Sequence, residues 1–78
     1  MSRYFFDLHD CIPIRDEHGL DLPDLDAVRL EAQRALAEMA AHHAASKDAV
    51  QIRADVRDIE GGRVLSATLV IVSELYAK

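Results

Sequence analysis

Hydrophobic and polar residues alternate near the start of the chain in the way that is typical of a β-strand. Tyr4, Phe6 and Leu8 lie at every second position and share one face of an extended segment over residues 3–9. Aromatic side chains favour such a pleated surface. Phe5 interrupts the alternation with a large apolar group on the opposite face. The pattern predicts a first strand that has apolar surroundings on both sides at that point.

A polar segment follows, and it predicts a turn before a second, shorter strand. Residues 16–19, Asp-Glu-His-Gly, have the composition of a turn, and Gly19 can adopt a positive φ without steric cost. Leu20 and Leu22 then alternate with Asp21. This pattern suits a short strand, which we expect at an edge of the sheet.

The middle of the chain has the spacing of an amphipathic helix. Pro23 and Asp24 mark its start, because an aspartate at the N-cap accepts hydrogen bonds from the first amides. His42 and His43 suit the last turn, where the helix dipole favours positive charge. The residues expected to face the sheet recur at steps of three and four: Leu25, Val28, Ala32, Ala35, Leu36, Met39 and His43.

The last third of the chain predicts two strands joined by a tight turn. Residues 50–58 alternate between apolar and polar positions, which indicates a strand with one buried face. The glycine pair at 61–62 follows Glu60 and favours a hairpin, because it makes positive φ accessible. Residues 63–72 are largely apolar on both faces, with Val70 and Val72 on the second face. We therefore expect this fourth strand to be buried on both sides.

The order of these elements predicts an α+β fold, ββαββ, in a single domain over residues 1–78. We expect a four-stranded, mostly antiparallel sheet with the helix packed on one face and no cover on the other. The first and fourth strands are expected either as neighbours in the middle or with the fourth at an edge that pairs with a second copy. The face opposite the helix would present Phe5, Asp7, His9, Arg53, Asp55, Arg57, Ser66, Thr68, Val70 and Val72.

Length and cysteine content narrow the class of protein. A chain of 78 residues has room for one core, and so small a core gains from self-association. The lone cysteine, Cys11, excludes an internal disulfide and fits a reducing compartment. We find no export signal at the start and no apolar run near the roughly 18 residues of a membrane span. The expected location is therefore the cytoplasm.

Charge is unevenly distributed along the chain. The net charge is −5, and residues 1–26 carry seven acidic against two basic residues, whereas residues 27–78 carry seven of each. In the last third, Arg53, Arg57 and Arg63 alternate with acidic residues instead of forming a uniformly basic face. This arrangement disfavours nucleic acid as a partner.

Residues capable of chemistry form no recognisable catalytic or metal-binding motif. His9 and Cys11 lie two residues apart on the first strand, where Asp7 could in principle join them around a metal ion. However, the chain has no Cys-x-x-Cys or His-Glu-x-x-His spacing. Cys11 has no glycine-rich elbow after it, and the glycines at 61–62 precede no phosphate-binding helix. We therefore expect no catalytic residue, no metal site and no cofactor.

Several short motifs, taken in order, resemble a known family. They are Arg3-Tyr4-Phe5-Phe6, Asp16-Glu17-x-Gly19, Leu22-Pro23-Asp24-Leu25, Arg34-Ala35-Leu36-Ala37-Glu38-Met39-Ala40, Val56-Arg57-Asp58 and a closing apolar strand. In this order the chain resembles, over nearly its whole length, an uncharacterised family of small bacterial proteins, a domain of unknown function. That resemblance implies no particular activity. Residues 16–40 also resemble small antitoxins with a partial ribonuclease-H-like fold, which implies a regulator that binds a toxin.

Three functions remain open from the sequence. The leading hypothesis is a non-enzymatic interaction module that forms a homodimer through the uncovered sheet face or the edge of the fourth strand. The second is an antitoxin-like regulator that binds a small toxin partner through the acidic segment. The third is a small-molecule-binding domain that uses the open sheet face. The candidate interaction residues are Phe5, Asp7, His9, Arg53, Arg57, Thr68, Val70 and Val72.

Overall fold

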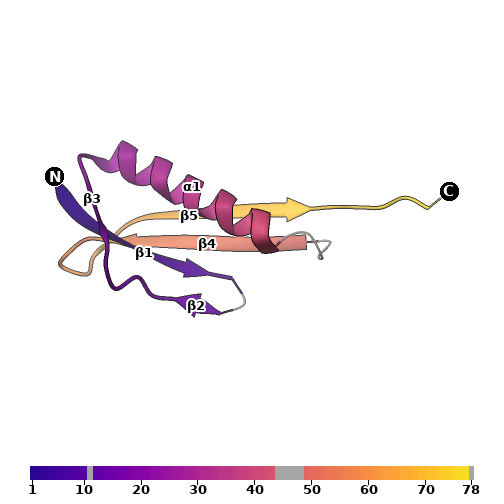
Figure 1. Cartoon of the computed structure of the whole chain (residues 1–78), viewed down its shortest axis with the longest axis horizontal. Coiled ribbons are helices and arrows are strands. Elements are labelled where there is room, and N and C mark those ends of the chain that lie inside the picture. The colour runs from indigo at the N-terminus through magenta and orange to yellow at the C-terminus, as the bar shows by residue number, and fades with distance from the viewer. Residues whose placement is uncertain (11, 44–48, 78) are drawn as a thin grey trace.

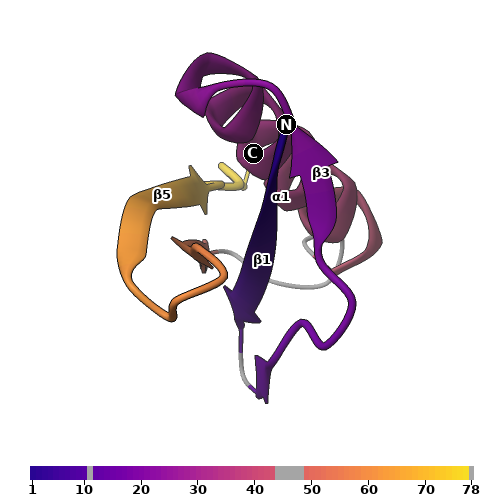
Figure 2. The ribbon, with the colours of Figure 1, turned by 90° about the vertical axis from the view of Figure 1, so that its left-hand side faces the viewer.

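The computed structural model describes residues 1–10, 12–43 and 49–77, with a helix on one side of an antiparallel sheet. The elements are β1 (Ser2–His9), β2 (Pro13–Ile14), β3 (Leu20–Leu22), α1 (Leu25–His43), β4 (Ala49–Arg57) and β5 (Arg63–Val72). Figures 1 and 2 show α1 lying along one face of the sheet. The predicted α+β class and ββαββ arrangement are confirmed. Cys11 and the side chain of His43 lie outside the described residues.

Within the described residues, the strands form one sheet in the order β2-β1-β4-β5, with β3 also paired to β1. Every pairing is antiparallel. The central position of β4 separates β1 from β5, so the alternative that made the first and last long strands neighbours is wrong. The other alternative is confirmed in its position, because β5 lies at the edge.

Two short strands, β2 and β3, pair with different parts of β1 along the same edge of the sheet. Near the start of β1, Tyr4 pairs with Leu20 of β3. Near its end, Leu8 pairs with Ile14 of β2. The sequence indicated only the second piece, at residues 20–22, because two residues are too short a run to show an alternating pattern. Residues 15–19 depart from the sheet between the two pieces, and this departure shapes the candidate site.

The hydrophobic core lies between α1 and the central strand β4. Side chains on the other strands, including Phe6 and Leu69, pack against it. The fully packed residues come from α1 and β4 in equal number: Val28, Ala32, Leu36, Ala40, Val50, Ile52, Ala54 and Val56. The steps of four on the helix and of two on the strand follow from helical and extended geometry.

The helix differs from the predicted stripe at both ends. Leu25 was expected to face the sheet, but it is 52% exposed. It stands in the first turn, ahead of Val28, the first helix residue in the core. Ala40 was not in the predicted stripe, yet it is buried one turn after Leu36. Ala35 and Met39 are half-buried beside the stripe.

The expectation that the last strand is buried on both sides is wrong. Val70 is 58% exposed and Val72 is 67% exposed. Both point away from α1, because residues 65, 67, 69 and 71 of this strand pack towards the core. A run of valines on both faces does not distinguish an edge strand from a central one, and here only one face has a helix over it.

The hairpin between β4 and β5 confirms the predicted turn. Gly61 has a φ of 91°, and its amide donates to the carbonyl of Asp58 at 3.0 Å. Atom Oδ1 of Asp58 accepts hydrogen bonds from the amides of Glu60 at 3.0 Å and Gly62 at 2.9 Å. The aspartate thus satisfies amides that have no partner within the tight turn.

Candidate functional site

The sheet face opposite α1, hereafter the open face, gathers the candidate interaction residues. Directly opposite residues of paired strands present their side chains on the same face. The register sets Phe5 against Arg57, His9 against Arg53, and Arg53 in turn against Thr68. Further along the sheet, Val70 and Val72 lie opposite Gln51 and Ala49. The eight residues therefore share one face, although they do not form one site.

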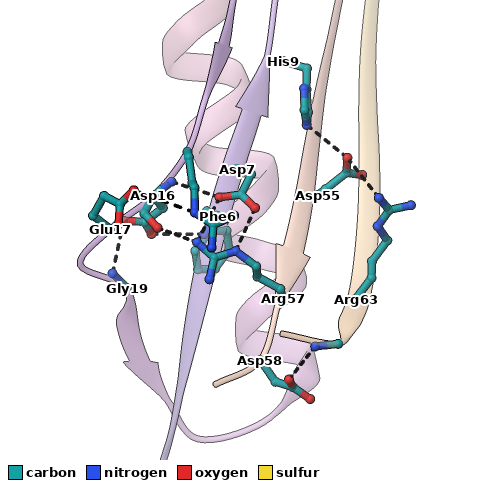
Figure 3. A network of polar contacts seen from close by, with 12 residues as sticks. Phe6, Asp7, His9, Asp16, Glu17, Gly19, Asp55, Arg57, Asp58 and Arg63 are labelled. Atoms are coloured by element: carbon teal, nitrogen blue, oxygen red, sulfur yellow. Dashed lines mark hydrogen bonds and ion pairs between the residues drawn. The ribbon is translucent and has the colours of Figure 1, made fainter. Parts of the chain in front are cut away.

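The Arg57 side chain contacts two other segments of the chain at the end of the open face nearest β3. Its Nε donates to Oδ2 of Asp7 at 2.9 Å, and its Nη2 donates to the carbonyl of Asp16 at 2.6 Å (Figure 3). The guanidinium also lies 4.6 Å from the centre of the Phe5 ring, within the range of a cation–π interaction. The side chains of Arg57 and Asp7 are only 17% and 19% exposed. One cation therefore joins β1, β4 and the segment at residues 15–19.

Phe5 is consequently covered by its own chain, which corrects the expectation that this face has no cover. The ring contacts the Arg57 guanidinium on the open face. The backbone of Gly19 also approaches it so closely that a Cβ there would stand 2.9 Å from Cε2 of the ring. Phe5 is half-buried as a result and contributes little apolar surface to a partner.

Asp16 fills the gap that residues 15–19 leave in the edge beside β1. Its Oδ2 accepts the Phe6 amide at 3.0 Å, in the place where a neighbouring strand would supply a carbonyl. Its Oδ1 accepts the amides of His18 at 3.0 Å and Gly19 at 3.1 Å. Burial alone would raise the pKa of Asp16, but these three amides stabilise the carboxylate and hold its pKa below the ordinary value.

The tight approach of Gly19 gives a testable consequence for stability. Gly19 has a φ of 74°, and an added Cβ would stand 2.9 Å from both Arg3 Cγ and Phe5 Cε2. Gly61 also has positive φ but has no atom within 4 Å of an added Cβ. We expect Gly19→Ala to lower the free energy of unfolding by about 1 kcal/mol more than Gly61→Ala, which has only the conformational cost. Urea denaturation of both variants checks this, and equal losses would contradict the packing around Gly19.

A second ion cluster centres on Asp55, which lies directly opposite Asp7 on the neighbouring strand. Two carboxylates at such positions repel each other unless each has its own cation. The cation of Asp7 is Arg57. Oδ2 of Asp55 lies 3.1 Å from Nε2 of His9 and 3.3 Å from Nη2 of Arg53 (Figure 3 labels His9).

Two residues of β5 complete the environment of Asp55. The Ser66 hydroxyl donates to Oδ1 at 2.7 Å, and Nη2 of Arg63 lies 3.8 Å from Oδ2. Asp55 is 7% exposed. The Ser66 hydrogen bond, followed by the nearby cations, lowers the pKa of Asp55 against the opposing effect of burial. This buried carboxylate is therefore ionised and neutralised within the chain.

A pocket of about 470 Å³ lies between these two clusters. Asp7, His9, Arg53 and Arg57 line it, so half of the predicted interaction residues belong to it. The lining also includes seven residues that were not among the candidate interaction residues: Pro13, Ile14, Arg15, Asp55, Val56, Gly61 and Arg63. Asp55 was predicted to lie on this face of the sheet, whereas the positions of Ile14 and Arg15 depend on how residues 13–19 fold back beside β1.

Thr68, Val70 and Val72 lie outside this pocket, towards the other end of β5. Beyond the valines, the chain continues in line with β5 and leaves the body of the molecule (Figure 1). In this tail Leu75 is 95% exposed and Tyr76 is 83% exposed. The open face thus has charged clusters over β1, β4 and the start of β5, and two exposed valines towards the other end of β5.

The comparison with protein families agrees with the resemblance seen in the sequence. Residues 3–70 match the family described as Domain of unknown function (DUF6894). The chain belongs to this family. No curated protein and no solved structure matches the chain.

The DUF6894 match spans the elements from β1 to most of β5, so it includes both ion clusters of the open face. Within the described residues, no helix is both long and apolar enough to cross a membrane. The same part of the chain holds no group of three or more histidine, cysteine or acidic residues arranged for a metal ion. Membership of the DUF6894 family assigns no activity to the pocket or to the valines.

Proposed function

We propose that the chain is a non-enzymatic interaction module that acts as a homodimer through the free edge of β5. The observation that carries the proposal is that one edge of β5 has no neighbouring strand within the described residues. β5 is ten residues long, and within the described part of the chain it pairs with β4 alone. A long edge strand with unpaired backbone groups is a template for another strand. Its exposed valines, Val70 and Val72, add apolar area that a partner strand would cover.

A second copy of the chain is the partner that fits this edge. Two copies of one strand related by a two-fold axis pair in antiparallel fashion and present the same surface to each other. If the axis passes at Val70, the two copies of Val70 face each other and Thr68 faces Val72 of the partner. The exposed valines then form one apolar cluster across the axis.

The same register pairs the exposed tail after β5 with the first half of β5 in the other copy. With the axis at Val70, Leu75 of one copy lies opposite Leu65 of the other, and Tyr76 lies opposite Val64. Leu75 and Tyr76 are almost fully exposed in the single chain, where the Tyr76 hydroxyl donates to Oε2 of Glu74 in the same tail. In the dimer each tail would extend the partner's sheet and bury these two side chains.

The alternative antitoxin-like function has less support from the contacts. It requires acidic residues that are available for a basic partner. Asp7 is bound to Arg57, Asp16 to three backbone amides, and Asp21 to Nε of Arg3 at 3.0 Å. The acidic segment is thus largely engaged within the chain. The small-molecule alternative is supported by the pocket and is developed below.

Sedimentation velocity and light scattering test the dimer. We expect a dimer at high micromolar concentration, and we expect Val70→Lys to raise the dissociation constant by at least about 30-fold, because two like charges would face each other at the axis. Leu30→Lys is the matched control, since Leu30 is 63% exposed on α1 and its substitution should leave the dimer intact. A wild-type chain that stays monomeric, or a Val70→Lys variant that dimerises equally well, would refute the proposal.

A further inference from the structure

The pocket on the open face has an excess of positive charge that the rest of the molecule does not share. Its lining includes four arginines, Arg15, Arg53, Arg57 and Arg63, against the two carboxylates of Asp7 and Asp55. The local charge is therefore +4 − 2 = +2 when His9 is neutral, whereas the whole chain carries −5. We propose that this pocket binds a small molecule through a phosphomonoester group.

The arginines on the rim retain donors for such a ligand. A guanidinium has five N–H groups. Within the described residues, Arg53 and Arg63 each contact Asp55 through one nitrogen, at 3.3 Å and 3.8 Å, and Arg15 contacts Glu17 at 3.7 Å. These three side chains are 51%, 67% and 67% exposed. Their remaining N–H groups can turn into the pocket without breaking a short hydrogen bond.

The two carboxylates in the pocket do not repel an anion as free acids would. Asp7 accepts hydrogen bonds from Arg57 and from the Asp16 amide at 2.9 Å. Asp55 accepts the Ser66 hydroxyl and has His9 beside it. Both carboxylates are thus screened by groups of the same chain, and the rim of the pocket is left to the arginines.

The charge and shape of the pocket select among anions. A phosphomonoester carries about −1.5 to −2 at neutral pH, which balances an excess of +2, and its oxygens match the paired N–H groups of a guanidinium. A carboxylate supplies half of that charge. The lining also includes the exposed apolar side chains of Pro13 and Ile14, and the volume of about 470 Å³ lies in the range of small-molecule sites. An organic body attached to the phosphate would rest against these apolar residues.

NMR titration of the wild-type chain with phenyl phosphate, inorganic phosphate and benzoate tests this inference. We expect phenyl phosphate to shift the Nε–Hε signals of Arg53 and Arg63 and the amide of Ile14. It should bind at least about tenfold more tightly than benzoate, because the phosphate carries up to twice the charge of a carboxylate and offers three acceptor oxygens where a carboxylate offers two. It should also bind more tightly than inorganic phosphate, which has no organic body.

Two variants and a control assign the binding to the pocket. Arg53→Gln and Arg63→Gln should each weaken phenyl phosphate at least about tenfold, because each removes a charged donor. Arg29→Gln removes the same charge from α1, where Arg29 lies 58% exposed beside Asp26, and should change the affinity less than about twofold. Melting temperatures verify that the variants fold.

The inference is overturned if no saturable shift occurs with wild-type protein, or if benzoate binds as tightly as phenyl phosphate. Equal affinity for inorganic phosphate would refute an organic ligand, and an equal loss in Arg29→Gln would show only a general charge effect. The outcome is independent of the dimer, because Val70→Lys leaves the pocket lining unchanged.

Discussion

Replacement of Arg57 by glutamine is expected to lower the free energy of unfolding by about 3 kcal/mol, the scale for breaking a largely buried ion pair. The change leaves the Asp7 carboxylate, 19% exposed, without its cation. It also removes the hydrogen bond to the carbonyl of Asp16 and the contact with the ring of Phe5. These losses affect three segments that are distant in sequence, so the whole open face should loosen.

Arg34→Gln provides the matched control for this experiment. Arg34 also binds carboxylates, with Nη1 at 2.7 Å from Glu38 and Nη2 at 2.5 Å from Glu31, but its side chain is 61% exposed on α1. Exposed pairs of this kind contribute less than about 1 kcal/mol. Urea denaturation at neutral pH measures both variants. If Arg57→Gln lowers the free energy of unfolding no more than Arg34→Gln does, then the contacts of Arg57 do not stabilise the open face.

Replacement of Asp16 by asparagine is expected to lower the free energy of unfolding by roughly 2 to 3 kcal/mol, although it changes only one atom of the side chain. Both carboxylate oxygens of Asp16 accept amide protons: Oδ2 from Phe6, and Oδ1 from His18 and Gly19. An asparagine has one acceptor oxygen, and its NH2 group would face an amide on the other side. At least one of the hydrogen bonds that the Asp16 side chain accepts from Phe6, His18 and Gly19 must then break.

Asp58→Asn is the control for the chemistry of this change. Asp58 also accepts two amides, but both hydrogen bonds go to Oδ1. An asparagine can place its single oxygen there and keep both bonds, so the expected loss is below about 1 kcal/mol. Hydrogen exchange of the Phe6 amide, read beside the two unfolding curves, localises the effect. If both variants lose a similar free energy of unfolding and the Phe6 amide stays protected, then Asp16 does not link β1 to residues 18–19 through its two carboxylate oxygens.

The sequence predicts the main elements well because their signals are local. The alternation over residues 50–58 and the N-cap at Asp24 each depend on neighbouring residues, and both elements are confirmed, with Asp24 accepting the Ala27 amide at 2.8 Å. The helix stripe fails only near its ends, where the position of the sheet decides what is covered. Leu25 has the angular position of a core residue but lies before the first core contact.

The organisation of the open face could not be predicted in this way. Arg57 is 50 residues from Asp7 and 41 residues from Asp16. Their contact depends on which strands are neighbours and on how residues 15–19 leave the sheet. Likewise, valines on both sides of the last strand are compatible with a central or an edge position, and only the strand order shows that Val70 and Val72 are exposed.

The two proposals use different halves of the open face. The pocket for a phosphomonoester lies over β1, β4 and the turn-proximal end of β5, where Arg63 begins the strand. The proposed dimer axis lies at Val70, nearer the other end of β5. A dimer would therefore carry two pockets, one on each copy. Either proposal can fail while the other stands.

The pairing of β5 with a second copy is the central claim, and an isotope-filtered NOESY spectrum tests it most directly. The sample mixes chains labelled with carbon-13 and nitrogen-15 with unlabelled chains, so that only contacts between copies appear. We predict cross-peaks between the methyl groups of Val70 in the two copies, and between Tyr76 and Val64. A dimer without cross-peaks at β5, or the absence of any cross-peak between copies at high concentration, would contradict the account.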